Sequence, residues 1–181
     1  MKIVILGAGA VGSTLASLLS EEHDIVIVDN NSSVLGYLEE EADLKTILGG
    51  CSYPNILVNA DIANADMVVA VTGSDETNIV SCLIAKVLNS SIKTIARVRE
   101  ASYLRGKTKE AMNSGLIPVD IHVSPEQLIT DQIQGLIDMP GSLQVLEFGD
   151  GLLNLVAVRA VKGGPMIGHE IADLKKHMPK V

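Results

Sequence analysis

The chain begins with Met1-Lys2-Ile3-Val4-Ile5-Leu6-Gly7-Ala8-Gly9-Ala10-Val11-Gly12, and this stretch predicts its fold. The run from Ile3 to Leu6 is short and wholly apolar, as is typical of a strand buried on both faces of a parallel sheet. Glycines follow at G-x-G-x-x-G spacing, and apolar residues then recur with helical period at Val11, Leu15, Leu18 and Leu19. A strand, a glycine turn and a helix in this order are typical of a dinucleotide-binding unit.

Each glycine of the motif has its own predicted role. Gly7 permits the tight turn, Gly9 lets the backbone approach a pyrophosphate, and Gly12 lets the helix pack closely on the strand. The free N–H groups at the start of the helix, together with the positive end of its dipole, would face the phosphates. A purely structural glycine turn is the alternative reading.

The predicted second strand, Asp24-Ile25-Val26-Ile27-Val28-Asp29, ends in an acid. Asp29 follows Gly12 by 17 residues, close to the roughly 20 expected for a carboxylate that accepts hydrogen bonds from a ribose. A carboxylate there would also repel a 2′-phosphate. The pattern therefore favours NAD(H), or another adenosine nucleotide such as ATP or ADP, over NADP; a solvated Asp at a strand end is the alternative.

Composition limits the class of protein. The 181 residues are 47% hydrophobic with no Trp, one Phe and three Tyr, so the core is aliphatic. A net charge of −8 argues against binding to nucleic acid or to anionic lipid. Cys51 and Cys82 lie outside any C-x-x-C pair and are expected to be reduced thiols. No apolar run approaches the roughly 18 residues of a membrane span. We expect a cytoplasmic protein that reaches the membrane only through a partner.

Strand and helix patterns alternate along the first 139 residues. They predict a doubly wound, Rossmann-like parallel sheet of the α/β class. The predicted strands cover residues 3–6, 24–29, 44–48, 67–71, 92–98 and 119–123. The helix after Ser74 is expected to bury Ile79, Val80, Leu83, Ile84, Val87 and Leu88.

A boundary is predicted at Met139-Pro140-Gly141, which divides the chain into a nucleotide-binding domain, 1–139, and a partial α+β subdomain, 140–181. In the second part, strands at 143–148 and 152–160 flank Gly149-Asp150-Gly151, a hairpin signal. A helix is predicted at about 170–176. So small a unit cannot bury its own sheet faces, so we expect either further sequence or another copy to complete it.

Four stretches together resemble the TrkA family, the NAD-binding regulatory subunits of Trk potassium uptake systems, whose domains are called KTN or RCK. Besides the glycine motif and Val28-Asp29, they are Ala70-Val71-Thr72-Gly73-Ser74-Asp75-Glu76-Thr77-Asn78 and Ile95-Ala96-Arg97-Val98-Arg99. The longest is the most specific, since ordinary dehydrogenases do not carry it. The segments at 124–126 and 140–146 also resemble the family's last Rossmann helix and the entry to its C-terminal RCK subdomain.

The resemblance implies a set of nucleotide contacts at the predicted carboxyl ends of the strands: Gly7, Ala8, Gly9, Ala10, Val11, Gly12, Asp29, Gly50, Thr72, Gly73 and Arg97. Arg97 lies within the fifth strand, where an unpaired cation is costly to bury, so a phosphate or carboxylate partner is plausible. A core acid could pair with Arg97 instead. Arg99, nearer the end of that strand, is its rival for the nucleotide.

An NAD-dependent oxidoreductase acting on a small substrate is the alternative function, because the same cofactor fold serves it. Hydride transfer needs a substrate pocket and a positioned acid or base. The 41 residues after Pro140 are too few for a substrate domain, and His122 is the best candidate base. We therefore expect a regulatory module rather than an enzyme, without a metal site. By family analogy it forms a dimer or tetramer and controls a membrane potassium transporter.

Overall fold

The computed structural model describes residues 1–148, 152–162 and 167. The chain divides into two compact units, the first covering residues 1–125 and the second beginning at Glu126. The sequence-based boundary at Met139 would assign the intervening helix to the first domain instead, and that assignment stays a prediction. Each unit is described by itself.

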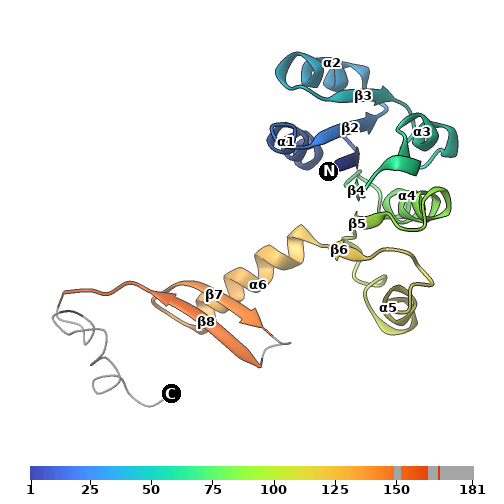
Figure 1. Ribbon diagram of the computed structural model, residues 1–181. Helices are drawn as coiled ribbons and strands as arrows, with labels where there is room; N and C mark the ends of the chain where they lie inside the picture. The colour runs from blue at the N-terminus through green and yellow to red at the C-terminus, as the bar shows by residue number, and fades with distance from the viewer. Residues whose placement is uncertain (149–151, 163–166, 168–181) are drawn as a thin grey trace. The chain divides into compact units, whose positions relative to one another are not determined.

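The first unit is built on a six-stranded sheet in the order β3-β2-β1-β4-β5-β6, with every neighbouring pair parallel (Figure 1). The chain order reverses between β1 and β4, which is the point where doubly wound folds bind ligands. The predicted fold class is confirmed. The strands are β1 Lys2–Leu6, β2 Asp24–Asp29, β3 Lys45–Leu48, β4 Met67–Ala70, β5 Lys93–Arg97 and β6 Ile121–Val123.

Helices cover both faces of this sheet because alternate side chains of the strands point to opposite sides. Ile3 and Ile5 of β1 join one buried cluster with α1 and α2, whereas Val4 and Leu6 join a second cluster with α3 and α4. Both clusters are almost wholly aliphatic, as the composition predicts. The helices are α1 Ala10–Leu19, α2 Ser32–Glu41, α3 Pro54–Asn59, the short 3₁₀ turn η1 Ile62–Asn64, α4 Asp75–Leu88 and α5 Gly106–Asn113.

The buried face of α4 differs from the predicted one. Ile79, Ile84 and Leu88 pack at the edge of the core, but Val80, Leu83 and Val87 are exposed. The face against the sheet consists of small residues, chiefly Ser81, Cys82 and Ala85, all fully buried. Small side chains let the helix approach the strands closely, and this rotates the larger ones outward. Val11 and Leu18 of α1 are likewise exposed, while Leu15 and Leu19 pack inward.

The second unit contains α6 Pro125–Asp138, except for its first residue, and an antiparallel hairpin of β7 Ser142–Phe148 and β8 Leu153–Val158. The two predicted strands are therefore present, whereas the turn at 149–151 and the helix predicted at 170–176 lie outside the described residues. Gly135 of α6 lies against β7, since a Cβ there would be 3.2 Å from Val145 Cβ. No helix within the described part of the chain is long and apolar enough to cross a membrane.

Candidate functional site

A cavity of about 600 Å³ opens at the carboxyl ends of the parallel strands. Loops that follow β1 to β4 contribute to it together with Arg97, the last residue of β5, and it spans the point where the strand order reverses. Its volume is within the range of small-molecule sites. Its lining residues are Gly7, Gly9, Asp29, Asn30, Gly49, Gly50, Cys51, Ser52, Tyr53, Val71, Thr72, Gly73, Ser74, Thr77 and Arg97.

The glycine loop has the geometry that the motif predicts. Gly7 has φ of +105° and lies against the Thr72 backbone. A side chain at this position is therefore disfavoured both by the backbone conformation and by the close contact with Thr72. A Cβ at Gly12 would lie 1.8 Å from the Gly7 carbonyl oxygen, which is why the helix can approach the strand only with glycine at this position. By contrast, no atom of the described residues lies within 4 Å of a Cβ built at Gly9, so the space beside it is open.

Asp29 is held in place by two backbone amides. Its Oδ2 accepts a hydrogen bond of 2.6 Å from the N–H of Ala8, and its Oδ1 accepts one of 2.8 Å from the N–H of Asn31. A carboxylate has about four lone-pair sites, so further acceptor capacity remains on the cavity side. The acid therefore connects the end of β2 to the glycine loop and can still accept hydrogen bonds from a diol.

The loop after β3 forms the wall of the cavity beside Asp29. Its Cys51 thiol donates to the Val28 carbonyl oxygen at 3.4 Å, and the Cys51 carbonyl accepts a 3.0 Å hydrogen bond from Ser81 of α4. Burial, reinforced by the negative charge of Asp29, raises the pKa of the Cys51 thiol to about 11. The thiol is therefore protonated at neutral pH, and it does not have the reactivity of a nucleophile.

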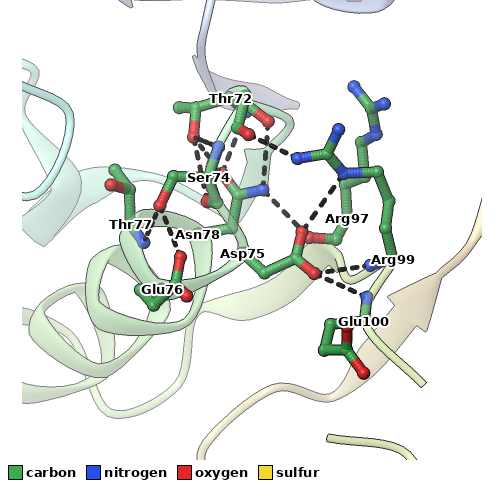
Figure 2. Close-up of polar contacts among 10 residues, drawn as sticks. Thr72, Ser74, Asp75, Glu76, Thr77, Asn78, Arg97, Arg99 and Glu100 are labelled. Atoms are coloured by element: carbon green, nitrogen blue, oxygen red, sulfur yellow. Dashed lines mark hydrogen bonds and ion pairs between the residues drawn. The ribbon is translucent and has the colours of Figure 1, made fainter. Parts of the chain in front are cut away.

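Asn78 organises the opposite wall, at the start of α4 (Figure 2). Its Oδ1 accepts hydrogen bonds from the backbone N–H and the hydroxyl of Thr72, at 2.9 and 2.7 Å, and its Nδ2 donates to the Arg97 carbonyl at 2.9 Å. Asn78 is fully buried. One amide side chain thus joins the ends of β4 and β5 to α4. The sequence did not predict this role, because Asn78 and Arg97 lie 19 residues apart and only the fold brings them together.

The first turn of α4 is fixed by a cap and an acid. Ser74 is the N-cap of α4, and its hydroxyl accepts a hydrogen bond of 3.1 Å from the N–H of Thr77. Asp75, which is 6% exposed, accepts hydrogen bonds of 2.8 and 2.7 Å from the N–H groups of Arg99 and Glu100. Burial pushes the pKa of the Asp75 carboxyl upward, but these hydrogen bonds and the Arg99 guanidinium outweigh it and hold the pKa below its ordinary value.

The two candidate arginines have different surroundings. The Arg99 side chain contacts the Asp75 carboxylate and donates to the Gly73 carbonyl, so it belongs to the scaffold of the loop. Arg97 lines the cavity, and its guanidinium lies away from the Asp75 carboxylate (Figure 2). This geometry favours Arg97 as the residue that faces a ligand, and its contact with a nucleotide stays a prediction.

Most of the residues proposed from the sequence line the cavity, namely Gly7, Gly9, Asp29, Gly50, Thr72, Gly73 and Arg97. Ala8, Ala10, Val11 and Gly12 are not among the lining residues: the N–H of Ala8 is bonded to Asp29, Ala10 and Val11 are exposed on α1, and Gly12 is buried in packing. Sequence reasoning missed the side chains of Asn30, Cys51, Ser52, Tyr53, Ser74 and Thr77. The sequence marks these residues only by their position in the segments that follow predicted strands.

The described residues that line the cavity include no histidine. His122, the best candidate from the sequence, lies on β6 and is exposed, and it is not among the lining residues. Within residues 1–148, 152–162 and 167, no three His, Cys, Asp or Glu side chains gather as a metal site would require. The lining offers glycine backbone, hydroxyls, the Cys51 thiol, the Asn30 amide, one carboxylate and one guanidinium.

Comparisons with known proteins agree with this geometry. The family model of the TrkA-N domain matches residues 3–124. The whole chain is 48% identical to 39% of the Trk system potassium uptake protein TrkA of Halomonas elongata, and it spans about 40% of the length of the curated relatives it matches.

Solved structures share the fold. The TrkA-N domain of the inner membrane protein ybaL from Escherichia coli gives a TM-score of 0.64 at 19% identity, over 75% of this chain and 96% of that one. The GsuK channel bound to NAD gives a TM-score of 0.60 at 25% identity, over 80% of this chain and 27% of that one.

Proposed function

This chain belongs to the TrkA-N domain family, and from that membership we propose that it is the nucleotide-sensing part of a regulatory subunit of a potassium uptake system. The relatives that carry the name Trk system potassium uptake protein support the assignment to potassium transport. The protein would act in the cytoplasm, at the inner face of the membrane, through a transporter partner. Residues 1–139 would form the sensing domain, and residues 140–181 would belong to a C-terminal RCK-type subdomain.

The proposed ligand is NAD(H), or a related adenine nucleotide such as ATP or ADP. The observation that carries this proposal is the position of Asp29, whose carboxylate lines the same cavity as Gly7 and Gly9 and is bonded to the loop between them. In this arrangement the phosphates would lie at the start of α1, where the helix dipole favours negative charge. The ribose hydroxyls would bond to Asp29. The NAD-bound GsuK channel, which shares this fold, supports the choice of ligand.

Regulation requires that the nucleotide distinguish two arrangements of the protein. A ligand shifts an equilibrium only by the difference between its affinities for the two states. We propose that the two states are arrangements of a homo-oligomer, a dimer or a tetramer, attached to the transporter. The cavity suits this role because its walls come from both halves of the sheet, so that bound nucleotide would connect the ends of β2 and β5.

Titration calorimetry tests the sensing function directly. Purified protein is titrated with NAD, NADH, ADP, ATP and NADPH, and the nucleotide that co-purifies is identified by mass spectrometry. We expect saturable binding of at least one nucleotide with a free 2′-hydroxyl and weaker binding of NADPH, because Asp29 would repel the 2′-phosphate. Absence of binding for the whole panel would overturn the proposal.

The second candidate function, an NAD-dependent oxidoreductase, has the Rossmann-like cleft in its favour. It predicts consumption of NADH in the presence of small carbonyl compounds. Regulation predicts binding without turnover, together with nucleotide-dependent rubidium flux when the protein is reconstituted with its transporter. The two readouts are independent, so the experiment separates the candidates.

A further inference from the structure

The order of the strands decides which end of the cavity would hold the base of a nucleotide. With phosphates at the start of α1 and ribose at Asp29, the base lies beyond Asp29, away from the glycine loop. β3 is the neighbour of β2 on the side away from β1, so the loop that follows β3 borders this end. Residues 49–53 of that loop all line the cavity.

Tyr53 is the aromatic residue among the residues that line the cavity. Its ring lies directly against Gly50, because a Cβ built at Gly50 would be 3.0–3.1 Å from three ring carbons. Tyr53 nevertheless remains 61% exposed. An aromatic side chain with this exposure inside a cavity leaves a large apolar surface that a planar ligand could cover.

The backbone of Tyr53 is fixed from both sides. Its N–H donates to the Gly50 carbonyl at 3.0 Å, and its own carbonyl accepts from the N–H groups of Ile56 and Leu57, at 3.0 Å each. Pro54 follows and restricts Tyr53 to the extended conformation, which it adopts with φ of −84° and ψ of 124°. The backbone that carries the ring is therefore preorganised, so that little backbone freedom would be lost on binding.

We propose that Tyr53 is the stacking platform for the adenine ring, an inference that rests on the proposed nucleotide function. Every nucleobase has a π face, and stacking on an aromatic side chain contributes about 1–3 kcal/mol per base. Gly50 has a defined part in this arrangement: any side chain there would displace the ring. Tyr53 would thus supply affinity for the base, while Asp29 supplies recognition of the sugar.

Substitutions at Tyr53 test this assignment with ADP and NAD as the two probes. We expect Tyr53→Leu to weaken both by about tenfold, equivalent to about 1.4 kcal/mol, because both carry adenine. Tyr53→Phe keeps the ring and should stay within about twofold of the natural protein. Tyr37 is the matched control, since it is 62% exposed on α2 and lies outside the cavity; Tyr37→Leu should change neither affinity.

A fluorescent variant reports stacking itself rather than affinity. The natural chain has no tryptophan, so Tyr53→Trp introduces a single reporter. Saturating ADP should quench its emission, while the emission of Tyr37→Trp should not change. This variant keeps an aromatic ring at the position, so the test does not depend on whether Tyr53→Leu folds.

The possible outcomes distinguish the stacking assignment of Tyr53 from the proposed nucleotide function on which it rests. If the natural protein binds neither ADP nor NAD, the stacking assignment fails, and if it binds no nucleotide of the calorimetric panel, the proposed function fails with it. If it binds ADP and NAD but Tyr53→Leu binds equally well, or loses NAD and keeps ADP, only the stacking assignment fails. Binding of ADP by Tyr53→Trp without quenching would also overturn it.

Discussion

The carboxylate of Asp29, at the end of β2, accepts a 2.6 Å hydrogen bond from the backbone N–H of Ala8 in the glycine loop after β1. These residues are 21 positions apart in the sequence. The bond means that the acid proposed to hold the ribose also fixes the loop proposed to hold the phosphates. Loss of Asp29 should therefore affect both parts of a nucleotide at once.

Asp29→Ala is expected to weaken NAD binding by about 1–3 kcal/mol, the scale for a charge-assisted hydrogen bond in a partly buried site. Calorimetry measures the change. Asp24→Ala is the matched control, because Asp24 is exposed at the opposite end of the same strand and should leave the affinity unchanged. An unaltered affinity in Asp29→Ala would remove this carboxylate from the site.

Alanine substitutions at Gly9 and Gly12 should differ in their effects on stability and on nucleotide binding. Gly12→Ala brings a methyl group to 1.8 Å from the Gly7 carbonyl oxygen and should cost about 1–3 kcal/mol of folding free energy, seen in urea unfolding. Gly9→Ala points into open space and should change the stability by less than about 0.5 kcal/mol. It should nevertheless weaken nucleotide binding, because the methyl group occupies the place where the phosphates approach. Equal stability losses in the two variants would contradict this geometry.

Substitutions at Arg97 and Arg99 test which of the two arginines contacts the nucleotide. Arg97→Met is expected to weaken binding of NAD and ADP by about 1.5–3 kcal/mol, through loss of a charged hydrogen bond to the ligand. Arg99→Met removes the contacts with Asp75 and Gly73, so it should lower the melting temperature. Thermal unfolding and calorimetry on both variants check this. A weaker nucleotide affinity in Arg99→Met alone would reverse the assignment.

Asp75 should make stability depend on pH in the acid range. Its folded pKa lies below its ordinary value, close to 3.9 in unfolded chains, so the stabilisation is fully present above about pH 4 and is lost as the pH falls through the folded pKa. Asp75→Asn should cost about 1–3 kcal/mol at pH 7. The difference from the natural protein should shrink below about pH 4. Urea unfolding at pH 7 and pH 3 measures it, with Asp24→Asn as control. A difference that stays constant with pH would contradict the role of the ionised carboxylate.

Much of the fold could be predicted because periodicity and turn chemistry are local properties. The run from Ile3 to Leu6, the glycine spacing and the acid at Asp29 predict a parallel α/β sheet and mark the end at which sheets of this kind bind ligands. The faces of α4 could not be predicted from hydrophobicity. Its packing is decided by how closely a helix approaches the sheet, and small residues such as Cys82 and Ala85 allow the closest approach.

The sequence by itself determined the class of the fold and placed the glycine loop and Asp29 at the ends of strands, because strand, turn and helix patterns depend on residues close together in the chain. Only the tertiary structure showed that Arg99 contacts Asp75 while Arg97 lines the cavity, since these contacts join residues of different elements. It likewise brought Tyr53 against Gly50 inside the cavity. Such contacts depend on strand order and loop conformation, which arise when the whole sheet assembles.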